Sequence, residues 1–227
     1  MKKCLFYISI ILFAASCNND DAEVPALAGK NYFPIDSGRY WIYDVHATTY
    51  GAQVTDTFYQ RKEVIYDSFL YQNVLVYELY EYYRPNSTYT WPDQPDSVWS
   101  FTTNGNQIRI KESNIEYVRL SFPLSNGEKW NGNSRNVFLS DDYTVSNFGK
   151  PFTLNSYYFP ATVNIIEEQS QNLVNKDYRN RMYAEYTGMI YRKKEFLRYN
   201  TDPQNIGQNI IDYGSVVEET LSSYGTP

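Results

Sequence analysis

Few side chains in this sequence could perform covalent or acid–base chemistry. The chain has one histidine, His46, and no Gly-x-Ser-x-Gly segment that would supply the serine of a catalytic triad. Its two cysteines, Cys4 and Cys17, both lie near the N-terminus, so the rest of the chain offers neither a thiol nucleophile nor a thiolate metal site. We therefore predict no cofactor, no metal site and no catalytic residue. We expect His46 to be a partly exposed strand residue.

Paired carboxylates could still support hydrolysis, because a glycosidase needs two acids about 5–10 Å apart across a cleft. The chain has four closely spaced acidic pairs: Asp93 and Asp96, Asp141 and Asp142, Glu167 and Glu168, and Glu218 and Glu219. Neighbouring residues on a strand point to opposite faces, so neither of the last two pairs can act across one cleft. Asp93 and Asp96 lie in "WPDQPD", a turn-rich segment in which aspartate commonly caps turns. The sequence favours a protein that is not an enzyme, with a carboxylate-based glycoside hydrolase as an alternative.

One stretch has the composition of a binding surface. The segment "YYRPNSTYTWPDQPDSVW" (residues 82–99) places several aromatic residues around a proline-rich loop. Sugar rings stack on aromatic faces beside carboxylate acceptors, and exposed loop residues on a rigid scaffold often carry function. We predict a carbohydrate platform formed by Tyr89, Trp91 and Asp93. The alternative is that these aromatic residues pack within the fold and that Trp91 covers a sheet edge.

The elements that would position these residues are strands. Aromatic residues make up 18% of the chain, with 24 tyrosines, and tyrosine suits a half-buried pleated surface. In "RYWIYDV" the alternate residues Trp41, Tyr43 and Val45 fall on one face. Residues 73–84 indicate a long central strand, and "SVVEETLSSY" near the C-terminus favours a last strand over a short helix. No amphipathic helix of more than ten residues is indicated.

Two turns are predicted between residues 97 and 121. Asn104-Gly105 separates two alternating segments, and this dipeptide favours a type I′ turn because both central residues need positive φ. Ser113-Asn114 is expected to form the next turn. The sequence thus predicts a single all-β domain over residues 31–227, a curved antiparallel sheet closing into a barrel or half-barrel.

A nine-residue phrase occurs twice. "FPIDSGRYW" (residues 33–41) and "FPLSNGEKW" (residues 122–130) share Phe-Pro, a glycine and a tryptophan at the same spacing. Proline belongs at a strand start or edge, glycine allows a turn, and the tryptophan would anchor the next strand in the core. We predict structural corners at two sets of residues: Pro34, Gly38 and Trp41, and Pro123, Gly127 and Trp130. Two similar halves or repeated use of one corner would both explain the repeat.

Three segments together resemble a diffuse set of extracytoplasmic bacterial proteins. These are "YFPIDSGRYWIY", "FPLSNGEKWNGN" and "YAEYTGMIYRK" (residues 183–193), which are similar to the "YxPLxxGxxWxY", "FPLxxGxxW" and "YAxGxGxV" segments of that set. The resemblance implies successive turns of a curved antiparallel sheet. It implies no single activity, because the set has none.

The N-terminus has the order of a secretory signal peptide. Lys2 and Lys3 precede an apolar run that is too short to span a membrane, and Leu12 to Cys17 resembles a bacterial lipobox. The resemblance implies removal of residues 1–16 and acylation (palmitate among the acyl chains) of Cys17, which would anchor the protein firmly in the outer membrane. Residues 17–30 are interpreted as a lipidated flexible tether. Its acidic residues Asp20 and Asp21 resemble the surface-export signal of Bacteroidota lipoproteins and favour the cell surface.

Charge narrows the choice of partners. The chain has 20 basic and 26 acidic residues, and removal of the two lysines of the signal peptide leaves a net charge near −8. Such a protein has no general attraction to nucleic acid. The basic segment "YRKKEFLR" (residues 191–198) alternates like a strand and is interpreted as a solvated sheet face.

The function expected from the sequence is a non-enzymatic lipoprotein, facing the surface or the periplasm, that binds a glycan, a small ligand or an envelope protein. The first alternative is a carrier that holds a lipid or another apolar molecule inside the barrel. The glycoside hydrolase is the second alternative.

Overall fold

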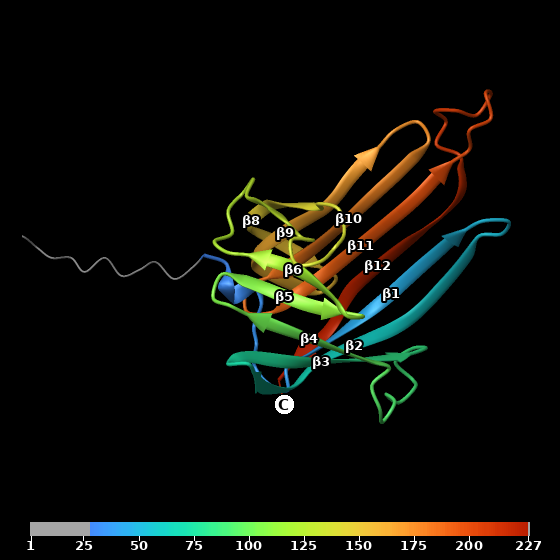
Figure 1. Ribbon diagram of the computed structural model, residues 1–227. Coiled ribbons are helices and arrows are strands. Elements are labelled where there is room, and N and C mark those ends of the chain that lie inside the picture. The colour runs from blue at the N-terminus through green and yellow to red at the C-terminus, as the bar shows by residue number, and fades with distance from the viewer. Residues whose placement is uncertain (1–27, 227) are drawn as a thin grey trace, which may run out of the picture.

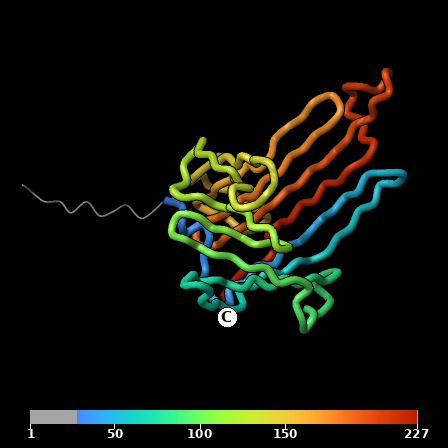
Figure 2. Tube along the Cα trace, viewed as in Figure 1, coloured from blue at the N-terminus to red at the C-terminus, as the bar shows by residue number. Residues whose placement is uncertain are grey.

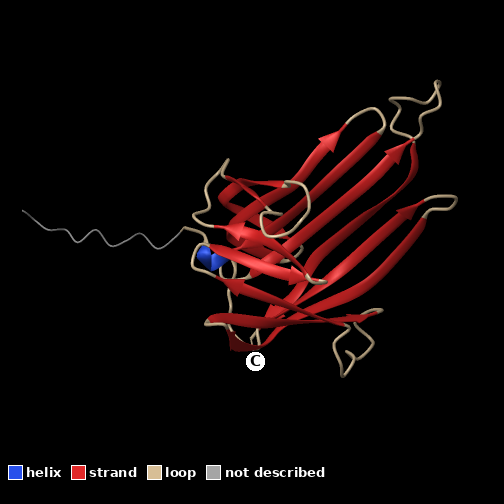
Figure 3. Cartoon of the chain, in the orientation of Figure 1, coloured by secondary structure: helices blue, strands red, loops and turns tan. Residues whose placement is uncertain are grey.

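A computed structural model describes residues 28–226 of the protein. The predicted signal peptide, the lipid attachment site Cys17 and most of the predicted tether lie outside the described residues. Within them the chain forms strands joined by loops, and the one helical element is a turn of 3-10 helix, η1 (Lys30–Tyr32), as Figure 3 shows. No helix in this part of the chain is long and apolar enough to cross a membrane.

The all-β prediction is confirmed, and the expected last strand near the C-terminus is present. The strands are β1 (Tyr40–Tyr50), β2 (Thr55–Tyr71), β3 (Val74–Arg84), β4 (Ser97–Thr103), β5 (Gln107–Glu112), β6 (Ile115–Ser121), β7 (Lys129–Asn131), β8 (Asp142–Leu154), β9 (Tyr157–Gln171), β10 (Asn175–Ala184), β11 (Gly188–Tyr199) and β12 (Ile211–Gly225).

The strands form one antiparallel sheet that nearly closes into a barrel (Figure 1). The order is β6-β5-β4-β3-β2-β1-β12-β11-β10-β9-β8-β7, so each strand neighbours the next along the chain except β6 and β7, which form the two edges, and the two ends of the domain meet in mid-sheet. Figure 2 shows this as blue β1 beside red β12. The edge strands β6 and β7 approach each other, since the amide of Val118 donates to the carbonyl of Gly132 (2.9 Å) and Trp130 Nε1 donates to the carbonyl of Val118 (2.9 Å). Polar contacts therefore bridge the two sheet edges.

The repeated phrase marks equivalent corners. In the first copy Gly38 donates its amide to the carbonyl of Ile65 in β2, and the amide of Ile65 donates to the carbonyl of Arg39. In the second copy Gly127 and Glu128 make the same two hydrogen bonds with Val145 of β8. Both glycines have positive φ, 79° and 85°.

Each corner opens a run of six consecutive strands, β1–β6 and β7–β12. The two halves of the sheet therefore begin in the same way.

The turns require one correction. The segments around Asn104-Gly105 do form a hairpin, β4–β5, but Thr103 pairs with Ile108, so the loop is wider than a two-residue type I′ turn. Only Gly105 has positive φ there, and the Asn104 side chain accepts a hydrogen bond from the Gln107 amide (3.1 Å). The asparagine closes the loop with its side chain and leaves its backbone out of the left-handed region.

Two-residue turns with both φ values positive occur at two other places. They are Ser113-Asn114, as predicted, and Gln72-Asn73 at the end of the β2–β3 hairpin. The predicted long strand before Arg84 is present as β3 and lies inside the sheet, between β2 and β4.

The apolar core fills the end of the barrel where the two corners lie. Trp41 and Ile65 are buried beside Phe101 and Leu120, and the barrel end is plugged by η1 and Leu124, whose amide donates to the carbonyl of Ala28 (2.9 Å). The folded domain therefore includes Ala28.

Candidate functional site

Above the apolar core, the inward faces of the strands carry charged side chains. On β1 the inward residues Trp41 and Tyr43 pair with Glu63 and Arg61 of β2, so the alternation of β1 places both charged residues inside the barrel. The same alternation turns Glu219 of β12 inward. The interior is therefore layered, with apolar residues at the closed end and charges above them.

Arg61 is the centre of the first charged cluster. Its Nη1 lies 2.7 Å from Glu81 Oε1 and its Nη2 lies 2.5 Å from Glu219 Oε2, and it also pairs with Glu63. Arg61 and Glu219 are each 2% exposed and Glu81 is 1% exposed. A second arginine, Arg192 of β11, pairs with Glu219. Burial raises the pKa of the Glu81 carboxyl even though Arg61 opposes the shift.

The second cluster joins the two sheet edges through the interior. Arg119 of β6 donates to Glu112 (2.6 Å) and to the hydroxyl of Tyr143 on β8 (2.9 Å), and it lies 3.7 Å from Glu167. Glu167 sits at a bulge of β9 and pairs with Arg181 of β10. Every carboxylate of the two clusters thus faces at least one guanidinium.

These clusters predict how stability depends on pH. Burial opposes ionisation of Glu112 and Glu219, but the neighbouring arginines overcome this effect and lower the pKa of each carboxyl to about 2. A depressed folded-state pKa adds stability that is complete above the unfolded value near 4.5 and is lost as the pH falls toward 2. Each group contributes on the order of 3 kcal/mol at neutral pH.

We therefore expect the free energy of unfolding in urea to fall steeply between pH 4.5 and pH 2, whereas the raised pKa of Glu81 acts above pH 4.5 and leaves this interval nearly unchanged. The Glu219→Gln variant should be less stable at pH 7 and should lose less over that interval. A stability that stays constant down to pH 2 would contradict the assignment.

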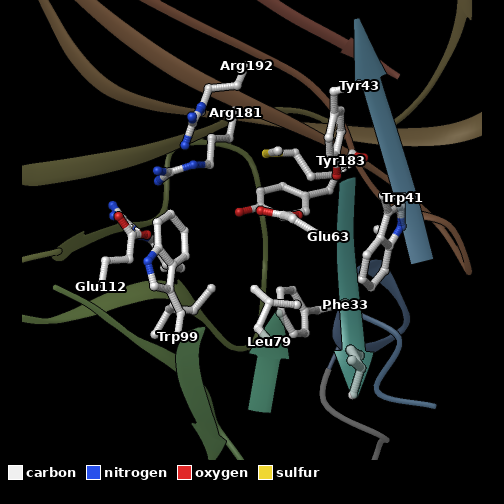
Figure 4. A pocket seen from close by; sticks show the side chains of 15 residues that line it. Phe33, Trp41, Tyr43, Glu63, Leu79, Trp99, Glu112, Arg181, Tyr183 and Arg192 are labelled. Atoms are coloured by element: carbon white, nitrogen blue, oxygen red, sulfur yellow. Dashed lines mark hydrogen bonds and ion pairs between the residues drawn. The ribbon is translucent and has the colours of Figure 1, made fainter. Parts of the chain in front are cut away.

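A small pocket lies between the apolar core and the charged clusters. Its volume is about 40 Å³, and Figure 4 shows Arg181 and Arg192 at one end and Phe33 and Leu79 at the other. The walls combine aromatic and charged side chains: Trp41, Tyr43, Trp99 and Tyr183, with Glu63, Glu112 and Arg119. The Nε of Arg192 is buried there without a hydrogen-bond partner among the described residues. A pocket of this volume has room for a few waters or one small polar group.

The basic segment on β11 corrects the sequence interpretation. Its residues alternate as expected. Tyr191, Lys193 and Glu195 face outward, but Arg192 and Lys194 point into the barrel. Among residues 28–226, no carboxylate forms an ion pair with Lys194. The charge of Arg192, followed by burial, lowers the pKa of the Lys194 amine to about 7. Lys194 lies one inward position beyond Arg192, toward the open end of the barrel.

Adjacent lysines should therefore titrate differently. Reductive methylation with ¹³C-formaldehyde followed by NMR is expected to show Lys194 titrating near pH 7. Lys193 is the internal control, because the hydrogen bonds that its amine donates to Glu218 and Glu195 overcome its partial burial and raise its pKa. A Lys194 signal that titrates with the ordinary surface lysines would show that this amine is not held beside Arg192.

The residues of the predicted platform lie apart from this pocket, in the loop between β3 and β4. Tyr89 is 55% exposed and Asp93 is exposed. Trp91 is half-buried, because the guanidinium of Arg84 lies 4.0 Å from the centre of its ring and Lys62 lies 5.8 Å from it. Of the two aromatic faces, Tyr89 is the freer one. The platform remains a prediction, since no glycan contact tests it.

The other candidates for chemistry are held in structural contacts. His46 lies on the outer face of β1. Its ring stacks on that of Phe58, with the ring centres 4.3 Å apart, and its Nε2 lies 2.9 Å from Asp56 Oδ1. Asp96 accepts a hydrogen bond from the amide of Tyr83 (2.8 Å), which ties the start of β4 to the end of β3. Glu218 and Glu219 point to opposite faces, as expected for adjacent strand residues. No group of three or more metal-ligating side chains occurs in the described part of the chain.

Glu63 and Glu112 both line the pocket, which is the feature a glycoside hydrolase would need. The Glu112 carboxyl is a poor general acid, because Arg119 and Arg181 overcome the effect of burial and lower its pKa to about 2. Glu63 is paired with Arg61. The interior carboxylates are placed to neutralise arginines.

Comparisons with known proteins give little further information. The sequence matches no protein-family profile, and no curated protein sequence matches it. Among solved structures, the chain is similar to a protein of Bacteroides fragilis NCTC 9343 that is named as exported and as having a YmcC-like fold. The TM-score is 0.40 at 10% sequence identity, over 86% of this chain and 98% of that chain.

The charged interior was not predicted from the sequence. Arg61, Glu81 and Arg181 appear there as ordinary polar positions of amphipathic strands. The available signal was parity, since Arg61 and Glu63 alternate in step with the buried Ile65, and Glu219 with the buried Leu221. When the inward-facing residues of a strand, every second one, change from apolar to charged along the strand, the barrel interior changes from apolar to charged in the same direction.

Proposed function

We propose that this protein is an envelope lipoprotein, anchored to the outer membrane through acylated Cys17, whose β domain binds a glycan, a small ligand or a segment of a partner protein without converting it. The strongest support is the interior pocket. It joins aromatic walls to arginines. Within residues 28–226, the Nε of Arg192 has no hydrogen-bond partner and Lys194, one inward position farther along β11, has no ion-pair partner, so both offer hydrogen-bond donors. The ligand group that fits is small and carries acceptor oxygens, such as a carboxylate or a sugar hydroxyl.

The size and filling of the interior favour this proposal over a lipid carrier. A pocket of about 40 Å³ is far below the roughly 300–1,000 Å³ of typical small-molecule sites, so no acyl chain fits without moving the core. Buried aromatic residues such as Trp41 and Phe101 occupy the space that a carrier would leave open. Only one end or one group of a larger ligand would enter the barrel.

The test begins with the acylated protein purified from its native membrane in mild detergent. Native mass spectrometry identifies a companion that leaves with denaturation, and the intact mass reports acylation of Cys17. Soluble glycans and small carboxylates are then titrated by calorimetry. A protein that carries no companion and binds no member of either panel would overturn the binding proposal.

Substitutions separate the interior site from the loop platform. Lys194→Met and Trp99→Leu change the barrel interior, whereas Trp91→Ala changes the loop between β3 and β4. We expect Lys194→Met to weaken binding at least about tenfold, as loss of one charge-assisted contact does, and Trp99→Leu to weaken it through the loss of an aromatic wall. Trp91→Ala should leave binding unchanged. The reverse result would place the ligand on Tyr89, Trp91 and Asp93, as the sequence predicted.

A further inference from the structure

The β2–β3 hairpin carries exposed apolar residues that the fold does not use. Leu70 is 74% exposed, Tyr71 61% and Phe69 47%, and Val74 and Leu75 on the other strand are also exposed. The cross-strand pairs are Tyr71 with Val74, Leu70 with Leu75 and Phe69 with Val76. Since successive residues alternate faces, the hairpin tip is apolar on both faces. A protein core or a flat partner surface would cover only one of them.

The apolar segment has sharp limits. Residues 68–77 contain no charged side chain, and the acids Asp67 and Glu78, which pair across the hairpin, stand at its base. From Phe69 to the Gln72-Asn73 turn the hairpin measures about 10 Å at ~3.3 Å per residue. That length matches the roughly 5–10 Å to which interfacial segments enter a bilayer. The paired carboxylates would stay in water.

The hairpin projects at the end of the domain where the chain enters it. Tyr40, the first residue of β1, pairs with Val64 of β2, so residues 65–71 extend beyond β1. The first corner bonds to the base of this extension, because the amide of Gly38 donates to the carbonyl of Ile65 (2.7 Å). In Figure 1 the hairpin tip and the first described residues both lie at the left end, opposite the β1–β2 turn.

The chain length sets how far a lipid anchor could be from this end. Residues 18–27 separate Cys17 from Ala28, and a fully extended chain over that interval spans at most about 40 Å. A bilayer that holds the acyl chains of Cys17 is therefore within reach of the hairpin end of the domain and is farther from the opposite end.

We propose that the tip of the β2–β3 hairpin, residues 69–76, inserts into the surface of the bilayer that holds the acylated N-terminus, and that this second contact fixes the open end of the barrel away from the membrane. The proposal rests on the lipid anchor of the proposed function. Aromatic and aliphatic side chains at the tip would occupy the headgroup boundary, where tyrosine is favoured.

The test places a fluorescent amino acid with a dansyl side chain at position 70 of the acylated protein, in vesicles of equal parts phosphatidylethanolamine and phosphatidylglycerol. Its emission should shift to the blue and be quenched by lipids brominated on their acyl chains. The control position is Val54, which is 61% exposed in the β1–β2 turn and should keep a water-like emission. Water-like emission at both positions, in protein that floats with the vesicles, would overturn the hairpin insertion while leaving the anchor intact.

If the intact mass shows no acylation, the lipid anchor of the proposed function is wrong, and this result does not decide whether the hairpin inserts. The hairpin is then tested in the same way after the Cys17 thiol has been coupled to a maleimide lipid.

A variant without any probe gives an independent answer. Leu70→Asp with Leu75→Asp alters an exposed cross-strand pair and should not affect folding, but it should lower vesicle binding of the unacylated mature chain by about tenfold or more. Val54→Asp is the matched control and should bind as the parent does. A concentration-dependent dimer that the double variant abolishes, with vesicle binding unchanged, would assign the tip to a second copy of the chain and overturn the proposal.

Discussion

Replacing Arg61 by methionine is expected to lower the free energy of unfolding by about 3–5 kcal/mol, the cost of removing one partner of a buried ion pair. Arg61 is 2% exposed and is the one guanidinium within ion-pair distance of Glu81 in the described residues, so the variant leaves that carboxylate buried without a cation. Glu219 keeps Arg192. A loss of this size is a large fraction of the roughly 5–15 kcal/mol that stabilises a typical domain.

The measurement is urea unfolding followed by tyrosine and tryptophan fluorescence. Arg198→Met is the matched control, because Arg198 forms an ion pair with Asp177 (2.9 Å) in which both side chains are about a quarter exposed. Such pairs contribute about 1 kcal/mol or less. Equal losses in the two variants would mean that the interior cluster is hydrated and is not a buried network.

A double variant tests the cause of the Arg61 effect. Arg61→Met combined with Glu81→Met removes both members of the most deeply buried pair, while Glu219 keeps Arg192 and Glu63, which is 12% exposed, loses its arginine. Apolar side chains of similar volume often replace a buried ion pair without a net loss. We expect the double variant to recover most of the stability. In Arg61→Met alone, the uncompensated Glu81 should favour protonation, so this variant should gain stability as the pH falls from 8 to 5. A double variant as unstable as the single one would show that Arg61 acts through packing on Tyr43, whose ring lies 4.8 Å from its guanidinium.

The sheet could be predicted because its local signals agree with one another. Alternation in β1 and β3, the turn at Ser113-Asn114 and the two Phe-Pro corners each specify a local backbone shape, and their sum is an antiparallel meander. The Asn104-Gly105 turn was misassigned in type because asparagine has two ways to close a loop, and only the three-dimensional context selects the side-chain hydrogen bond.

The interior site could not be predicted from the same signals, because it depends on long-range register. Arg61 and Glu219 meet only because β1 lies between β2 and β12, and Arg119 reaches Glu167 only because the sheet curls until its two edges approach. Local periodicity shows which residues share a face of each strand, but it does not show which faces line the barrel interior. The predicted platform at Tyr89 and Trp91 was a local signal, and it lies outside the barrel.

Trp41→Ala is expected to cost about 3–5 kcal/mol, as large-to-small changes of a buried tryptophan do. Trp41 is 5% exposed, and its Nε1 donates to the carbonyl of Thr187 (2.5 Å) in the turn between β10 and β11. The Trp41 ring packs directly on Gly188. A Cβ at position 188 would lie only 2.8 Å from Trp41 Nε1, so this close packing requires a glycine. Trp41→Phe should lose about 1–3 kcal/mol, because the Thr187 carbonyl would lose its donor.

The second copy of the phrase provides the matched comparison. Trp130 occupies the same place in its corner, is half-buried, and donates to the carbonyl of Val118 across the barrel edges (2.9 Å). Urea unfolding should show a smaller loss for Trp130→Ala, about 2 kcal/mol, because less of its surface is removed from water. A loss below about 1 kcal/mol for Trp41→Ala would contradict its role as a core anchor. If Trp130→Ala costs as much as Trp41→Ala, the contact between β6 and β7 closes the barrel cooperatively, and the two corners stabilise the fold equally despite their different burial.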